Sequence, residues 1–258
     1  MSDTKKTTPT PDSNKKVFVA SAEAKGKASQ LRMFAIILWV LAIAAEVFAI
    51  IQLKNMASVN MPLLIVLIVV DLILAVTGAL LWKKAQKLDP PSQANGFEFF
   101  FKSQLGAIMM VIAFLPLLIL ILTDKNLEGK QKGILGAIAG VALLVGLAFG
   151  INWNPESIEK YTAQINEVVD LTGSDTVYWI SKGDSGYKYH LYEDCQHIKG
   201  KEIASGKVGD ALEQNKIKEL CGTCKKKAEK AKGIEGETTP ETEEVAPETE
   251  EITEDDAA

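Results

Sequence analysis

The chain has 258 residues, a formal net charge of −5 and 47% hydrophobic residues, but its polar and apolar residues lie in separate stretches. The net charge is a sum of basic and acidic stretches, so it implies no single field that would steer a charged partner. The three cysteines are an odd number in a chain of this length, which argues against a disulfide framework.

Residues 1–31 are polar and rich in lysine, and we expect them to be disordered. Residues 32–152 are mostly apolar and contain four runs close to the roughly 20 residues that a helix needs to cross a bilayer. Lipid offers no partners to backbone groups, so each run must be helical. The sequence therefore predicts an α-helical membrane protein whose four transmembrane helices are Met33–Leu53, Met61–Trp82, Leu105–Thr123 and Ile134–Ile151.

The distribution of basic residues predicts how the helices are oriented. Lysines and Arg32 gather before the first helix and between the second and third, whereas the loop between the first and second holds only Lys54. The loop between the third and fourth holds three further lysines, which weakens the contrast. The bias still places both termini in the cytoplasm. We expect a multi-pass protein of the bacterial cell membrane, with its cysteines in a reducing compartment.

Two carboxyl groups, Glu46 and Asp71, interrupt the apolar runs. A carboxylate in mid-bilayer costs several kcal/mol unless it is protonated, paired or hydrated. With both helices spanning the bilayer, the depths of the two differ by only ~5 Å. Two interpretations are open: the pair couples the transport of a proton or cation, or each carboxyl is neutral and hydrogen-bonds across the bundle, for example to Thr77 or Gln52.

The fourth apolar run carries two G-x-x-x-G steps, formed by Gly136, Gly140, Gly146 and Gly150. Small residues at this spacing allow two helix backbones to approach closely. The motif is consistent with a dimerisation face of a homo-oligomer or with packing inside one bundle, and we favour the second interpretation.

Residues 153–173 predict an amphipathic linker helix that begins at Asn154-Pro155-Glu156 and ends near Gly173. A β-hairpin is predicted to follow, with strands at Val177–Ile180 and Tyr187–Tyr192 around a Gly/Asp/Ser turn. Residues 174–232 would thus form a small α+β module.

All three cysteines fall into one spaced pattern with a histidine, His190-x4-Cys195 followed later by Cys221-x-x-Cys224. Zn²⁺ favours four nitrogen and sulfur ligands in a tetrahedron, and closed sites with three cysteines and one histidine are structural. A domain this small has little core, so a bound Zn²⁺ would contribute much of its folding free energy.

The stretch Tyr187–Lys225 resembles the zinc modules related to the N-terminal metal-binding domain of the Ada DNA-repair protein. The resemblance rests on Tyr189-His190, Cys195, Ala211-Leu212 and the Cys221-x-x-Cys224 pair. It implies that the four metal ligands are His190, Cys195, Cys221 and Cys224, with His197 as the rival of His190. Asn215 and Leu220 depart from the family pattern, which has glycine and proline at these positions.

The resemblance does not extend to DNA chemistry. The module has no arginine, the commonest base-reading residue, and His190 occupies a position where the Ada repair reaction has a thiolate ligand.

Residues 233–258 form an acidic tail that we expect to be disordered. We therefore expect a non-enzymatic protein of the lipid bilayer whose zinc module binds a cytoplasmic protein partner. The alternatives are a small transporter that uses Glu46 and Asp71, and a membrane-tethered nucleic-acid-binding protein.

Overall fold

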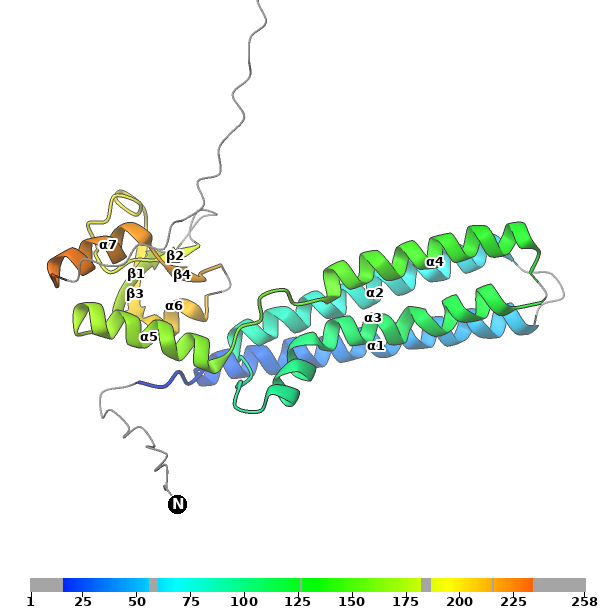
Figure 1. Cartoon of the computed structure of the whole chain (residues 1–258), viewed down its shortest axis with the longest axis horizontal. Helices are drawn as coiled ribbons and strands as arrows, with labels where there is room; N and C mark the ends of the chain where they lie inside the picture. Colours follow the sequence, from blue (N-terminus) through cyan, green and yellow to red (C-terminus); the bar gives the residue numbers. More distant parts are fainter. Residues whose placement is uncertain (1–15, 56–59, 126, 182–186, 215, 234–258) are drawn as a thin grey trace, which may run out of the picture.

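The computed structural model describes residues 16–55, 60–125, 127–181, 187–214 and 216–233. Within these residues a bundle of long helices carries a small α+β module at one end, the end from which the N-terminal segment enters (Figure 1). The helices of the bundle are α1 (Ala22–Asn55), α2 (Met61–Leu88), α3 (Gly96–Thr123) and α4 (Gly129–Gly150). All are long and apolar enough to cross a membrane, which confirms the predicted number of spans for the described part of the chain.

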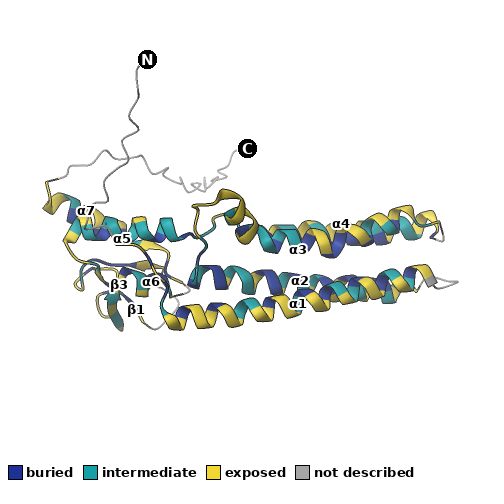
Figure 2. Cartoon of the chain, turned by 90° about the horizontal axis from the view of Figure 1, so that it is seen from below, coloured by how far each residue is buried: buried dark blue, intermediate teal, exposed yellow. Residues whose placement is uncertain are grey.

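The outer faces of the bundle are apolar. Large side chains such as Val40, Ile73 and Leu144 are exposed there, and Figure 2 shows exposed residues along the outer side of α1. The inner faces bury mainly alanine, leucine and isoleucine around Phe114 and Trp39. This is the pattern of helices that face lipid outward and each other inward.

Three helices extend past the predicted spans at the end that carries the module. α1 begins at Ala22 and α2 runs to Leu88, where Arg32 forms an ion pair with Asp89 at 2.8 Å. The predicted disordered segment 1–31 is therefore wrong for residues 16–31, because residues 16–21 pack on the module and α1 follows. Its first fifteen residues, like the predicted acidic tail from residue 234 on, lie outside the described residues.

α5 (Ile158–Thr172) is the predicted linker helix with a later start. The N-cap is Ser157 rather than Asn154, because the Ser157 hydroxyl accepts a hydrogen bond from the Lys160 backbone at 3.0 Å. The helix ends at Gly173, whose φ of 73° is the left-handed conformation that glycine adopts without strain.

The remaining elements are β1 (Thr176–Ile180), β2 (Lys188–Tyr189), β3 (Ile203–Lys207), α6 (Val208–Leu212), β4 (Glu219–Leu220) and α7 (Gly222–Ala231). β1 pairs antiparallel with β3, and β2 pairs parallel with β4. The predicted hairpin is confirmed only in part. Its two strands meet antiparallel at a single bridge, between Tyr178 and His190, and the longer ladder of β1 is with β3. The predicted turn, residues 183–186, lies entirely outside the described residues.

One core joins the module to the bundle. The apolar face of α5 packs in the same cluster as Phe18 from the N-terminal segment, Ala28 from α1 and Leu88 from α2. The Tyr161 hydroxyl donates to the backbone carbonyl of Lys87 at 3.1 Å. Residues 174–232 thus share their core with residues that the sequence assigned to other segments.

Candidate metal centre

The parallel pairing of β2 with β4 sets two of the predicted ligands side by side. Lys188 is opposite Glu219 and Tyr189 is opposite Leu220. His190 directly follows β2 and Cys221 directly follows β4, so the in-register ladder brings them together although thirty residues separate them in the chain. The Cys221 backbone N–H donates to the Tyr189 carbonyl at 2.9 Å, and His190 exchanges two backbone hydrogen bonds with Tyr178 of β1.

The other two ligands come from a turn and from a helix start. Cys195 heads a run of turns in which its carbonyl accepts from Ile198 and Lys199 at 3.0 Å. Cys224 lies in the first turn of α7, and Cys221 is the N-cap of that helix. The positive end of the helix dipole therefore faces two of the three thiols and favours their ionised form.

The four side chains form one buried cluster that could hold a metal ion. Their ligand atoms all lie within 4.8 Å of one another. His190 Nδ1 is 3.3 Å from Cys195 Sγ and 3.8 Å from Cys224 Sγ. A tetrahedral zinc ion with ordinary bond lengths separates a nitrogen from a sulfur ligand by about 3.6 Å. The donor set and its spacing therefore fit a tetrahedral metal ion, and they identify Nδ1 as the nitrogen that faces it.

The surroundings of the cluster shift the pKa values of His190, Cys221 and Cys224, and not all in the same direction. Burial, with the neighbouring His197 as a smaller cause, lowers the pKa of His190 to about 4, so the imidazole is neutral at pH 7. Burial opposes ionisation of Cys221, but backbone N–H groups of Cys224 and Thr223 outweigh it and lower the pKa of Cys221. Burial raises the pKa of Cys224 despite N–H donors from residues 191 and 192. A cation among the thiols would displace their protons.

His197, the rival ligand, lies outside the cluster. Its Nε2 is 3.1 Å from Thr223 Oγ1, and its ring centroid is 6.4 Å from that of His190. His197 is exposed, whereas His190 is 4% exposed. Its contact with Thr223 places it against the first turn of α7, as a neighbour of the cluster.

Glu46 and Asp71 are both buried inside the bundle, at 5% and 1% exposure. Glu46 Oε1 accepts a hydrogen bond from the Leu117 backbone of α3 at 3.2 Å. Thr77, one suggested partner, instead donates to the Ile73 carbonyl of its own helix. Among the described residues neither oxygen of Asp71 has a hydrogen-bond partner.

The glycines of α4 divide into two pairs. A Cβ added to Gly146 would lie 2.9 Å from Met110 Sδ, and one added to Gly150 would lie 3.0 Å from the Ala107 backbone, so this pair packs on α3. Gly136 would meet the Leu122 side chain at 3.0 Å, and Gly140 would meet nothing within 4 Å. The sequence reasoning overlooked two further close approaches, whose signal was a lone glycine in an apolar run. A Cβ on Gly78 would lie 2.6 Å from Trp39 Nε1, and one on Gly106 would lie 2.9 Å from the Gly150 carbonyl oxygen.

Comparisons with protein-family models, with curated proteins and with solved structures found no match for this chain. The likeness to the Ada-type modules therefore rests on its short motif and on the cluster that the motif residues form.

Proposed function

We propose that this chain is a non-enzymatic integral membrane protein in which a structural zinc ion holds a module on the cytoplasmic ends of the helices, where the module binds a protein partner. The observation that carries the proposal is the buried cluster of His190, Cys195, Cys221 and Cys224. A site of three thiols and one imidazole binds zinc in preference to harder cations such as Mg²⁺ and Ca²⁺, which favour oxygen ligands.

The ligand count supports a structural role over a catalytic one. Catalytic zinc sites keep a position open for water or substrate, whereas a site with four protein ligands is closed. Here all four donors belong to buried residues. When bound, the zinc ion would tie the β2–β4 ladder to the turn at Cys195 and to the start of α7, and would thereby stabilise a module with short strands.

The location and the surface of the module support a cytoplasmic partner. The module lies at the end of the bundle where the lysine-rich segments are, which the charge bias assigns to the cytoplasm (Figure 1). The exposed face of α7 carries Lys226 and Lys230. Such a surface favours a partner with acidic side chains.

The test is the metal content of the full chain, purified in mild detergent under reducing conditions and measured by elemental analysis. We expect one zinc ion per chain. The Cys221→Ser variant should lose it and become sensitive to protease in the module, whereas the His197→Gln variant should keep it. A folded wild-type chain without metal, or equal loss in both variants, would overturn the assignment of the ligands.

The pair Glu46 and Asp71 favours a second candidate function, the binding and transfer of a proton or cation within the bundle. The supporting observation is that Asp71 is 1% exposed inside the bundle, yet its oxygens have no hydrogen-bond partner among the described residues. Purified protein in vesicles should then give a proton or cation flux that Asp71→Asn abolishes. Glu98→Gln, which changes an exposed carboxyl of α3, is the matched control. Equal flux in the wild type and in Asp71→Asn would reject this candidate.

A further inference from the structure

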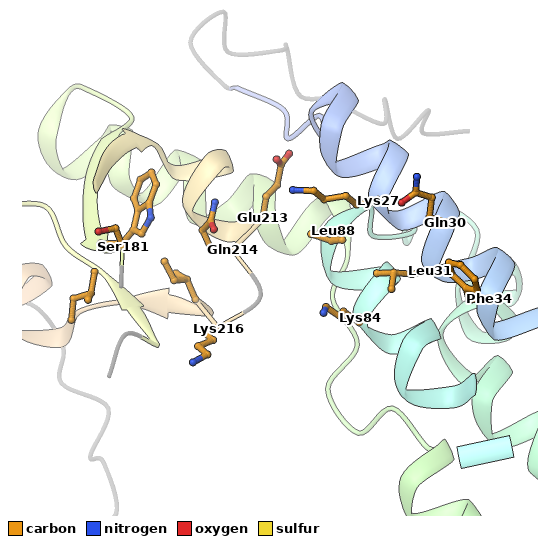
Figure 3. A pocket seen from close by; sticks show the side chains of 13 residues that line it. Lys27, Gln30, Leu31, Phe34, Lys84, Leu88, Ser181, Glu213, Gln214 and Lys216 are labelled. Atoms are coloured by element: carbon orange, nitrogen blue, oxygen red, sulfur yellow. The ribbon is translucent and has the colours of Figure 1, made fainter. Parts of the chain in front are cut away.

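A cavity of about 620 Å³ lies between the module and the cytoplasmic ends of α1 and α2. Figure 3 shows Lys27, Leu31 and Lys84 on the helix side of this space, with Glu213, Gln214 and Lys216 on the module side. Buried parts of the module, Trp179 and Ile217, complete the wall. The cavity therefore has both cationic and apolar walls.

The positive charge of the cavity exceeds its negative charge. Three of its lining residues are lysines and one, Glu213, is acidic. The Glu213 carboxylate already accepts two hydrogen bonds from Ser21, from its backbone N–H at 2.6 Å and from its hydroxyl at 2.7 Å. Lys27 forms an exposed ion pair with Glu23 at 2.6 Å, which contributes little. An anionic group would be attracted to this site.

The cavity also lies at the level where the helices enter the apolar part of the bilayer. Phe34, which lines it, is 53% exposed and stands one residue inside the first predicted span. Lys27 lies two helical turns further out, and Lys84 follows Trp82, the last residue of the second predicted span. Phe34 is thus at the edge of the acyl-chain region with Leu31 just outside it, and Lys27 and Lys84 are at the depth of headgroups.

We infer that this cavity is a binding site for one anionic glycerophospholipid of the cytoplasmic leaflet. Its phosphate would lie among Lys27, Lys84 and Lys216, and one acyl chain would lie along Leu31 and Phe34. Basic pockets at the cytoplasmic side of transmembrane helices recognise lipid headgroups by this combination of charge and apolar surface. A bound lipid would also fill the space between the bundle and the module.

The test is native mass spectrometry of the full chain in mild detergent with equal amounts of phosphatidylglycerol and phosphatidylcholine. We expect the wild type to retain phosphatidylglycerol preferentially. The triple variant Lys27→Gln, Lys84→Gln and Lys216→Gln should have a weaker preference for phosphatidylglycerol. Each lysine that is removed should lower this preference about five-fold. Equal retention of both lipids by the wild type, or an unchanged preference in the variant, would overturn the inference.

The matched control makes the same change of charge at the opposite end of the bundle, with Lys125→Gln, Lys130→Gln and Lys132→Gln. It should keep the preference of the wild type, and a parallel loss would show a general effect of charge that contradicts a specific site. Should the triple variant at the cavity fail to fold by circular dichroism, Lys84→Gln alone gives the same test at an exposed position.

A third measurement separates a lipid from a soluble phosphate ester. Glycerol phosphate has the anionic group of the headgroup without acyl chains. We expect it to leave the bound phosphatidylglycerol in place at millimolar concentration, because it gains nothing from Leu31 and Phe34. Displacement of the lipid at a similar concentration of each would reject the lipid and identify the cavity as a site for a soluble phosphate ester.

Discussion

The ring of Phe18 packs edge-on against the ring of Tyr161, with the two centroids 4.9 Å apart. This contact joins the N-terminal segment to α5, and the Phe18 backbone N–H also donates to Thr162 Oγ1 at 3.0 Å. Lys16 adds an ion pair with Asp175 at 2.9 Å. The segment before α1 is therefore a structural part of the module.

The Phe18→Ala variant should destabilise the module by about 3–5 kcal/mol, the usual cost of truncating a buried phenylalanine. Phe18 is 3% exposed, whereas its neighbour Val19 is 72% exposed. Val19→Ala is thus a matched control that should change stability little. Limited proteolysis of the full chain in detergent would compare the two, and equal digestion of both variants would contradict the structural role of Phe18.

Acid should release the metal in a defined range of pH. Burial lowers the pKa of His190 from its ordinary 6.5 to about 4. Between these values the unfolded chain binds a proton that the folded module excludes, so stability decreases as the pH falls from about 6.5 towards 4. Protons also compete with the metal for the ligands. We expect zinc to remain bound at pH 7 and to be lost over this range, as measured with a chromogenic chelator.

Two variants sharpen the acid titration. His190→Gln should lack zinc already at pH 7, whereas His197→Gln should follow the profile of the wild type. A wild-type chain that loses its zinc above pH 7, or a His197→Gln profile displaced from that of the wild type, would contradict the assignment of His190 as the histidine ligand.

The two intramembrane carboxyls should respond in opposite directions to replacement by leucine. Glu46→Leu removes the hydrogen bond that Glu46 Oε1 accepts from the Leu117 N–H, which should cost about 0.5–1.5 kcal/mol. Asp71→Leu removes a buried group that has no partner among the described residues, so it should raise the stability by a similar amount. Thermal unfolding in detergent measures both. Destabilisation by Asp71→Leu would indicate a bound ligand at Asp71 and support the second candidate function.

Glycine-to-alanine changes should distinguish close packing from open surface. A Cβ at position 78 would lie 2.6 Å from Trp39 Nε1, so Gly78→Ala should cost about 1–3 kcal/mol through overpacking of α1 against α2. Gly140→Ala meets nothing within 4 Å and should be neutral or stabilising by up to about 1 kcal/mol. Loss of stability in Gly140→Ala, together with a change in oligomeric state, would instead place a second copy of the chain at this position.

The sequence by itself determined the helical bundle, and with the Ada-type resemblance it indicated the four residues of the cluster that could hold a metal ion. Each membrane helix satisfies its backbone hydrogen bonds within its own segment, so the local sequence of a run such as Met61–Trp82 is enough to predict that it is helical. The cluster was also accessible from the sequence, because a chain with three cysteines and two histidines offers few sets of four nitrogen and sulfur ligands, and the resemblance favoured His190 over His197.

Only the tertiary structure decided the contacts that depend on distant partners. β2 and β4 are two residues long, and the pairing that aligns His190 with Cys221 has no signal in either strand. Phe18 stands in a polar segment, and its burial depends on a surface of α5 far along the chain. The cavity between Lys84 and Lys216 exists only once the module has docked. Local hydropathy depends only on residues that are neighbours in the sequence. These features instead depend on contacts between segments that are far apart in the sequence, so no local pattern predicts them.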